Sequence, residues 1–200
     1  TLLVVFCWAV LIFTSGINMY ILLAIFITGA SLLTYLIMYF PRFDYIQGRI
    51  FSFFNRETGT HNFQSDKAIE SITSGGFFGK GIGEGVLKNR VPEAHTDYII
   101  SVISEEFGVV AIMLILLLFL ILIYMVFKKI SFETNDKAKL ILIGSISLIL
   151  MQATIHIGVN IRLFPTTGMT LPFLSYGGSS IISTSILGGI ILNLTKRKIT

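Results

Sequence analysis

The chain has 200 residues, of which 54% are hydrophobic and only 13% are charged. A soluble globular domain usually has about 25% charged residues, so this composition excludes an ordinary soluble fold and indicates a helical integral membrane protein. The formal net charge of +4 does not indicate nucleic-acid binding, because the basic residues are scattered among segments that flank apolar runs and form no stripe.

Five apolar segments are predicted, at residues 1–14, 18–40, 98–127, 140–161 and 179–195. A helix needs about 20 apolar residues to cross a bilayer core. The first segment is shorter than this and does not begin with methionine, so we expect a fragment cut inside or just before a spanning helix. The predicted fold is an all-α polytopic bundle of about five spanning helices, forming one domain over residues 1–200. Its single cysteine, Cys7, is expected to be a small membrane-buried residue.

The short basic segments set the expected orientation, because Lys and Arg in short loops mark the cytoplasmic side. The link 128–139 and the tail after residue 195 lie two crossings apart, so both are expected in the cytoplasm. The loops 41–97 and 161–178 then share the extracytoplasmic side. The basic residues concerned are Lys128, Lys129, Lys137, Lys139, Lys196, Arg197 and Lys198.

The loop 41–97 is longer than a plain connection between spanning helices needs. Its seven basic and seven acidic residues balance, and charge in a long loop orients a membrane protein poorly. Its many phenylalanines argue against disorder. We therefore expect short helices on the outer membrane surface, with turns at Ser74–Gly76 and Gly79–Gly85.

The second outer loop, Asn160–Ser180, is largely apolar but is interrupted by Pro165, Gly168 and Pro172. Irregular backbone at membrane depth is tolerated only where protein buries it or water lines it. We predict a re-entrant or cavity-lining element here, with a simple interfacial loop as the alternative.

A polar triplet, His95-Thr96-Asp97, stands at the mouth of the third apolar segment, which contains 21 uncharged residues from Phe107 to Phe127. Thr96 or Asp97 is a candidate N-cap. The functional interpretation is that Asp97 is a carboxylate at headgroup level facing a lipid-linked substrate, either as a general base or as a metal-binding group. His95 would share a proton with Asp97 or orient it, or else serve in a turn or cap. Glu93 would add a second carboxylate or solvate the loop.

Other polar positions allow less specific interpretations. The stretch GKGIGEG lacks the third glycine of GxGxxG, but its backbone donors with Lys80, Lys88 and Arg90 are candidates for holding a pyrophosphate. A flexible hinge is the alternative. Glu105 and Glu106 are expected to form a water-exposed collar, because charges inside a membrane are costly. For Gln152, His156 and Asn160 in the fourth segment, interhelical hydrogen bonding is expected.

Two stretches resemble signatures of the SEDS family (shape, elongation, division and sporulation). They are GGFFGKGIGEGVLKNRVPEAHTDYIISVISEEFG and FPTTGMTLPFLSYGGSS, followed by a final helix and KRK. The earlier PRFDYIQGRIFSFFN resembles the family's segment after its seventh helix, so the resemblance covers essentially the whole chain. PEAHTD and PTTGMTLP are closer to the division-type members than to the elongation-type members. Thr167 stands where division-type members often have lysine, so no role of that cation is carried over.

The resemblance implies a ten-helix fold of which this chain supplies helices six to ten. It implies a peptidoglycan glycosyltransferase that polymerises lipid II during cell division and releases undecaprenyl pyrophosphate. Asp97 would deprotonate the acceptor's sugar 4-hydroxyl, or help a divalent cation (Mg or Mn) activate it, for attack on the anomeric carbon bearing the pyrophosphate. No nucleotide or organic cofactor is expected. The candidate substrate-binding residues are His95, Thr96, Lys80, Lys88, Arg90, Ser175, Tyr176, Gly177, Gly178 and Ser179.

The implied partners are lipid II, a class B penicillin-binding protein transpeptidase, divisome proteins and membrane lipids. The implied location is the bacterial inner membrane at the division septum, with a cytoplasmic C-terminus. Two alternatives remain open from the sequence. A lipid II flippase or transporter also fits broken segments around a polar site, and a non-catalytic scaffold for the penicillin-binding protein needs no reacting residue.

Overall fold

The computed structural model is all-helical over the residues it describes, which are 2–54, 60–86, 90 and 94–196. Lys88 and Glu93 lie outside these ranges. Four helices are long and apolar enough to cross a membrane: α2 (Met19–Tyr39), α6 (Ile99–Phe132), α7 (Asp136–Asn160) and α8 (Gly178–Thr195). A fifth apolar helix, α1 (Leu2–Thr14), is shorter. The predicted polytopic helical membrane fold is confirmed.

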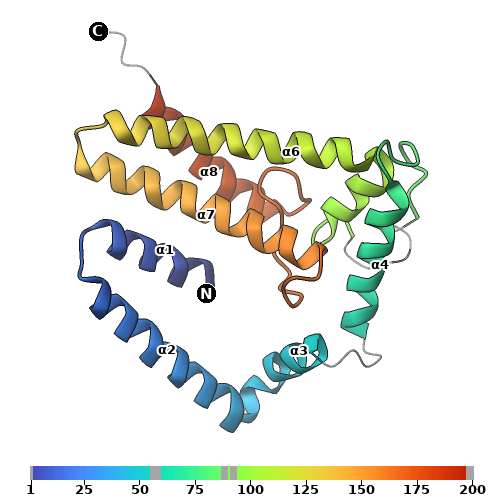
Figure 1. The fold of residues 1–200 in the computed structure, drawn as a ribbon, viewed down its shortest axis with the longest axis horizontal. Coiled ribbons are helices and arrows are strands. Elements are labelled where there is room, and N and C mark those ends of the chain that lie inside the picture. Colours follow the sequence, from blue (N-terminus) through green and yellow to red (C-terminus); the bar gives the residue numbers. More distant parts are fainter. Residues whose placement is uncertain (1, 55–59, 87–89, 91–93, 197–200) are drawn as a thin grey trace.

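The helices α6, α7 and α8 lie side by side, and α1 lies against α7 (Figure 1). Val126 of α6, Leu142, Ile146 and Ile149 of α7, and Ile191 of α8 form one buried apolar cluster between the three long helices. The lipid-facing surface of α6 is also apolar and exposed, as expected for a helix whose outer face meets hydrocarbon rather than water. The helix α2 has no buried residue and leads away from α1 toward α3.

The link between α6 and α7 is shorter than the sequence predicted. Only Glu133–Asn135 separates the two helices, whereas a loop was expected over 128–139. The helix α7 begins early because the Asn135 side chain caps it, accepting a hydrogen bond from the Lys137 backbone nitrogen at 3.0 Å. Lysines of the expected loop therefore belong to the last turns of α6 and the first turn of α7.

The segment after α2 contains short helices: a 3-10 turn at Pro41–Phe43, α3 (Asp44–Phe54) and α4 (Thr60–Gly75). The helix α4 packs against the first part of α6 (Figure 1). An ion pair between Asp66 of α4 and Arg162 after α7 fastens α4 to the same end of the bundle. On which side of the membrane this end lies stays a prediction.

The helix α6 is broken at Gly108, whose backbone (φ 77°, ψ −174°) is not helical. Such a break leaves carbonyl oxygens and N–H groups of the helix without their usual partners. The loop after α4 supplies them: the backbone nitrogens of Lys80 and Gly81 donate to the oxygens of Glu105 and Glu106, and the nitrogen of Val109 donates to the oxygen of Gly76. The loop thus connects the two parts of α6 through hydrogen bonds. The first part of α6 bends toward α4 (Figure 1).

Glu105 is not part of a water-exposed collar, which corrects the sequence-based expectation. Its side chain is only 3% exposed, and the Lys80 ammonium contacts its Oε1 at 2.9 Å. The backbone nitrogen of Val86 donates to its Oε2 at 3.1 Å. A buried carboxylate is stable when it is paired and hydrogen-bonded, and the folded loop provides both kinds of partner.

Replacing Lys80 with methionine should destabilise the full-length protein by about 1–3 kcal/mol, because it leaves a buried carboxylate without its cation. The loss of stability is measured by thermal unfolding of the protein in detergent. Lys67→Met is the matched control, since the Lys67–Glu70 pair is an exposed i,i+3 pair on α4 and such pairs contribute little. Equal effects of the two substitutions would contradict the assignment of Glu105 as a buried anchor.

Candidate functional site

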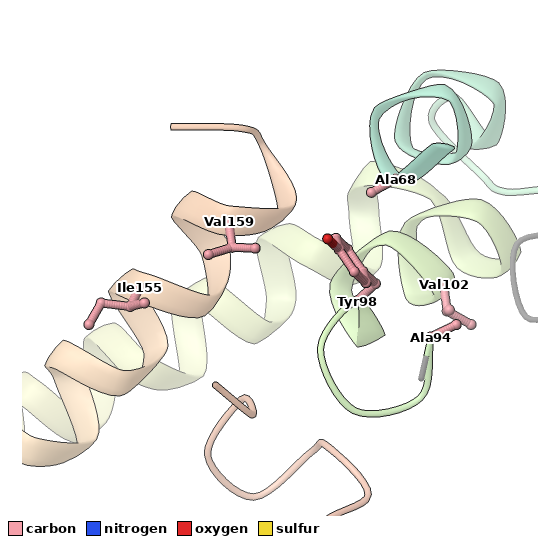
Figure 2. Packing of buried hydrophobic residues seen from close by; sticks show 6 residues of the cluster. All are labelled: Ala68, Ala94, Tyr98, Val102, Ile155 and Val159. Carbon is pink, nitrogen blue, oxygen red and sulfur yellow. The ribbon is translucent and has the colours of Figure 1, made fainter. Parts of the chain in front are cut away.

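The candidate site is built around the beginning of α6. Tyr98, the residue before the helix, is 2% exposed and lies between Val159 of α7 and Ala68 of α4 (Figure 2). Ala94, Val102 of α6 and Ile155 of α7 complete this buried cluster (Figure 2). This apolar cluster fixes the point at which the chain enters α6. It therefore also fixes the position of the polar triplet, which comes just before α6, relative to α4 and α7.

The N-cap of α6 is Tyr98, and no side chain caps the helix. The prediction that Thr96 or Asp97 is the N-cap was therefore wrong. The reason is that residues 94–98 form turns, which place both side chains outside the first helical turn. Asp97 is partly buried rather than committed to capping.

The three backbone oxygens of the triplet each accept a hydrogen bond from a segment distant in sequence. The oxygen of His95 accepts from the Tyr176 backbone nitrogen at 3.1 Å. The oxygen of Thr96 accepts from the Ser175 hydroxyl at 2.7 Å. The oxygen of Asp97 accepts from the Asn160 side-chain amide at 3.0 Å. The C-terminal end of α7 and the loop before α8 thus hold the triplet together through its backbone.

The loop 161–177 folds back against α7 through polar contacts. The Gln152 amide donates to the Thr170 backbone oxygen at 2.9 Å and to the Ser180 hydroxyl of α8 at 3.2 Å. The ring nitrogen Nδ1 of His156, which is fully buried, bonds the Met169 oxygen at 2.7 Å. Because a carbonyl only accepts, this nitrogen carries the proton. Gln152, His156 and Asn160 are four residues apart and share one face of α7. The expected interhelical hydrogen bonding holds for Gln152, which bonds Ser180 of α8, and for Asn160, which bonds Ser101 of α6, whereas His156 bonds the loop instead.

Arg49 of α3 belongs to the site although the sequence interpretation did not include it. Its Nη1 donates to the Thr166 backbone oxygen at 2.8 Å. Two residues further on, Gly168 lies beside the carboxylate: a Cβ added at Gly168 would be 3.6 Å from Oδ2 of Asp97. The loop therefore brings Arg49 and Asp97, which lie near opposite ends of the segment 41–97, into one region.

The ionisation of Tyr98 reflects both charges. Burial is the main cause that raises the pKa of the Tyr98 phenol above its ordinary value, and the Asp97 charge adds to the rise. The nearby Ser65 hydroxyl and the charge of Arg49 act in the opposite direction. The phenol therefore stays neutral near pH 7.

Lys80 and Arg90 line a separate polar cavity of about 240 Å³ beside α4, together with Glu70 and Glu105. Lys67 lowers the pKa of Glu70 through a hydrogen bond and its charge, and Arg90 and Lys80 act in the same direction from further away. The backbone donors of Lys80 and Gly81 are bonded to α6, so they are not available to a phosphate as the GKGIGEG interpretation required. Binding of a pyrophosphate by the Lys80, Arg90 and Lys88 side chains stays a prediction.

The remaining predicted residues lie at the start of α8. Gly177 is the N-cap of this helix, and Gly178 and Ser179 are exposed in its first turn. Tyr176 is 80% exposed, whereas Ser175 is 1% exposed and its hydroxyl also accepts from the Leu171 backbone nitrogen at 2.8 Å. The structure thus brings Ser175 and Tyr176 to the triplet, with Ser175 engaged inside the protein.

The donor set for a divalent cation is small. Across the described ranges, no group of three or more His, Cys, Asp or Glu side chains could hold a metal ion. Asp97 alone is compatible with Mg²⁺, which keeps several waters and is usually bound by one or two carboxylates together with substrate phosphates. Asp97 is thus the described residue that would contact such a cation, and a cation at this site stays a prediction.

Comparison with known proteins gives consistent matches. The sequence model of the family FTSW_RODA_SPOVE, described as "Cell cycle protein", matches residues 1–199. A chain in a solved structure described as "Structural coordination of polymerization and crosslinking by a peptidoglycan synthase complex" superposes with a TM-score of 0.76 and 26% identity, covering 100% of this chain and 56% of that one.

Curated relatives named "Probable peptidoglycan glycosyltransferase FtsW" are also similar. The protein of Enterococcus hirae is 41% identical over 138 residues, which are 68% of this chain and 35% of the relative. The protein of Caulobacter vibrioides is 39% identical over 158 residues, 78% of this chain and 40% of the relative. The protein of Trichlorobacter lovleyi is 34% identical over 190 residues, 93% of this chain and 49% of the relative. The chain thus spans less than half the length of each.

Proposed function

We propose, because the chain belongs to the FtsW/RodA/SpoVE family, that it forms the part of a peptidoglycan glycosyltransferase that carries the reacting carboxylate, Asp97. This is the SEDS family that the sequence motifs resemble. The single observation that carries the proposal is the triplet His95-Thr96-Asp97, held by α7 and the loop before α8 at one end of the membrane bundle. A carboxylate fixed in this way suits general-base chemistry better than it suits a passive scaffold.

The reaction proposed is the joining of two lipid-linked glycan units. The 4-hydroxyl oxygen of the acceptor sugar attacks the anomeric carbon of the donor, forming the new glycosidic bond as the bond from that carbon to the pyrophosphate oxygen breaks. The hydroxyl proton passes to Asp97, and undecaprenyl pyrophosphate leaves with its electron pair. When bound, a divalent cation would neutralise charge on the pyrophosphate, and Asp97 is the residue that would contact it.

The position of the triplet suits a lipid-linked substrate. It lies at the end of the bundle where α6 and α8 begin and α7 ends, opposite the end that carries the lysines of α6 and α7. Under the positive-inside rule that lysine-rich end is cytoplasmic. The triplet would then face the extracytoplasmic headgroup layer, where the sugars and pyrophosphate of lipid II are found while the polyprenyl chain stays in hydrocarbon.

The similar proteins also support a proposal for the partners and the location. The superposed chain belongs to a peptidoglycan synthase complex in which polymerization and crosslinking are coordinated. We infer a class B penicillin-binding protein as the crosslinking partner of the full-length protein. Because relatives named FtsW are similar to the chain, we infer that the full-length protein works among divisome proteins at the septum of the bacterial inner membrane. The positive-inside rule favours a cytoplasmic C-terminus.

The test is polymerisation of fluorescent lipid II by the purified full-length protein with its transpeptidase partner, with products separated on a gel. A ladder of glycan strands is the expected result. Translocation of lipid II in vesicles without any polymer would replace the proposal with a transporter. If the protein neither forms polymer nor translocates lipid II, but still stimulates the partner's transpeptidase activity, it acts as a scaffold and the proposal is wrong.

Arg49 is expected to assist this reaction. Its guanidinium is held by the Thr166 oxygen in the loop beside Asp97, and a fixed cation there would stabilise negative charge on the departing pyrophosphate. Arg49→Gln should lower kcat for polymerisation about 100-fold, the usual effect of removing one such donor. Arg162→Gln is the matched control, because Arg162 pairs with Asp66 instead. Equal polymerisation rates for Arg49→Gln and Arg162→Gln would show that Arg49 does not assist the reaction.

A further inference from the structure

We propose that Asn160 and Ser175 are positioning residues, which act through the backbone of the polar triplet to hold the Asp97 carboxylate where the reaction occurs. This inference rests on the proposed glycosyltransferase function and adds two residues to it. Neither side chain is expected to touch substrate, because Asn160 is fully buried and Ser175 is 1% exposed.

The amide of Asn160 has all of its hydrogen-bonding capacity engaged. Its Nδ2 donates to the backbone oxygen of Asp97 at 3.0 Å and to that of His156 at 2.8 Å. Its Oδ1 accepts from the backbone nitrogen and the hydroxyl of Ser101, at 3.2 Å and 2.7 Å. One side chain therefore joins its own helix, the residue before Tyr98 and the first turn of α6.

Ser175 performs the same task from the other side. Its hydroxyl donates to the backbone oxygen of Thr96 at 2.7 Å and accepts from the backbone nitrogen of Leu171 at 2.8 Å. The next residue, Tyr176, bonds the oxygen of His95 through its backbone nitrogen. The triplet is thus held by hydrogen bonds from α7 and from the loop before α8. Each of these bonds is made to a backbone oxygen of the triplet rather than to a reacting side chain.

The break in α6 explains why these hydrogen bonds from Asn160 and Ser175 are needed. The non-helical backbone of Gly108 interrupts the helix eleven residues after Asp97. The long membrane-crossing part of α6 therefore does not by itself dictate where the first turns, and the triplet before them, are placed. Tertiary hydrogen bonds have to supply the position that a continuous helix would have supplied.

The expected effect is kinetic. A displacement of about 1 Å at a reacting group can cost about 100-fold in rate. Asn160→Ala should lower kcat for lipid II polymerisation by about 10-fold to 100-fold while KM changes by less than about 3-fold, because substrate contacts remain. Asn160→Asp should do no better, since it keeps the shape but offers the Asp97 oxygen a carboxylate oxygen in place of a donor.

The experiment compares Asn160→Ala, Asn160→Asp, Ser175→Ala and the double alanine variant in the full-length protein with its partner. The control is Thr184→Ala, which removes a buried hydroxyl that bonds to the backbone oxygens of Ser180 and Ile181 in its own helix. Thermal unfolding is measured for every variant. If both residues act by placing the triplet, the double variant loses less than the product of the two single losses.

A second measurement does not depend on activity. A cysteine placed by Asp97→Cys, in protein that lacks other cysteines, is labelled with a membrane-impermeant thiosulfonate, and we expect Asn160→Ala to change its labelling rate at least threefold. Thr184→Ala should leave that rate unchanged.

A kcat within twofold of wild type for folded Asn160→Ala would overturn the inference. So would losses that multiply in the double variant and match the loss of folded protein, as a purely structural role would give. If the wild type and Asp97→Asn behave alike in polymerisation, the proposed function fails instead, and the labelling rates still decide whether Asn160 positions residue 97.

Discussion

Asp97→Asn in the full-length protein abolishes lipid II polymerisation, with an expected fall in rate of at least about 1,000-fold. The substitution keeps the size and shape of the side chain but removes its ability to accept a proton at neutral pH, and a positioned general base contributes about 100-fold to 10,000-fold. Loss of any cation contact made by the carboxylate acts in the same direction. The measurement is the initial rate of glycan strand formation from fluorescent lipid II.

The matched control is Asp136→Asn, the same chemical change at the opposite end of the bundle. Asp136 lies in the first turn of α7, is 91% exposed and contacts Lys139 at 3.7 Å. Its replacement should leave the rate within about twofold of wild type, since exposed pairs contribute little. Expression and co-purification of the transpeptidase should be unchanged in both variants. More than a tenth of the wild-type rate in Asp97→Asn would exclude Asp97 as the reacting group.

Much of the fold can be predicted from the apolar runs alone. Segments of this length and composition have to cross a bilayer as helices, and α2, α6, α7 and α8 appear where the runs predicted them. The helix ends are less predictable. The early start of α7 depends on the local cap at Asn135, whereas the late end of α6 extends helical structure into the lysines that were assigned to a loop.

The candidate site could be predicted only in part. The triplet was recognisable because a polar stretch precedes 21 uncharged residues. Its supports were not, because the bond from Asn160 to Asp97 joins residues 63 positions apart and has no local signature. Arg49 was missed for the same reason: it lies within PRFDYIQGRIFSFFN, but nothing in that stretch indicates contact with Thr166.

The buried state of Glu105 could not be predicted from hydropathy, which treats any carboxylate near an apolar run as interfacial. Its burial depends on three tertiary features together: the break at Gly108, the loop that enters it and the Lys80 side chain that the loop carries. The glycines of GKGIGEG were assigned to turns or a phosphate cradle. The turns are present, since Gly79, Gly81 and Gly83 have positive φ. The close contact of Gly79 with the α6 backbone is revealed only by the folded loop.

Gly79→Ala should therefore be the most damaging substitution in the loop, with a loss of several kcal/mol of stability and of most folded protein. Gly79 has φ +76°, and a Cβ there would lie 2.2 Å from the backbone oxygen of Glu106, so the loop has to move away from α6. Left-handed backbone alone costs a non-glycine residue about 1–2 kcal/mol. The further loss comes from the bonds of Lys80 and Gly81 to α6, at about 1 kcal/mol each.

Gly76→Ala separates these two causes, because Gly76 lies in the same loop with φ +59° and has nothing within 4 Å of an added Cβ. It should show only the conformational cost, with a small fall in the thermal midpoint in detergent. If Gly76→Ala and Gly79→Ala are equally stable, close contact between the loop and α6 is not what holds the break in place. If only Gly79→Ala is strongly destabilised, the contact between the loop and α6 at Gly108 stabilises the bent first part of α6. It then also stabilises the position of the Asp97 carboxylate, which precedes this part of the helix.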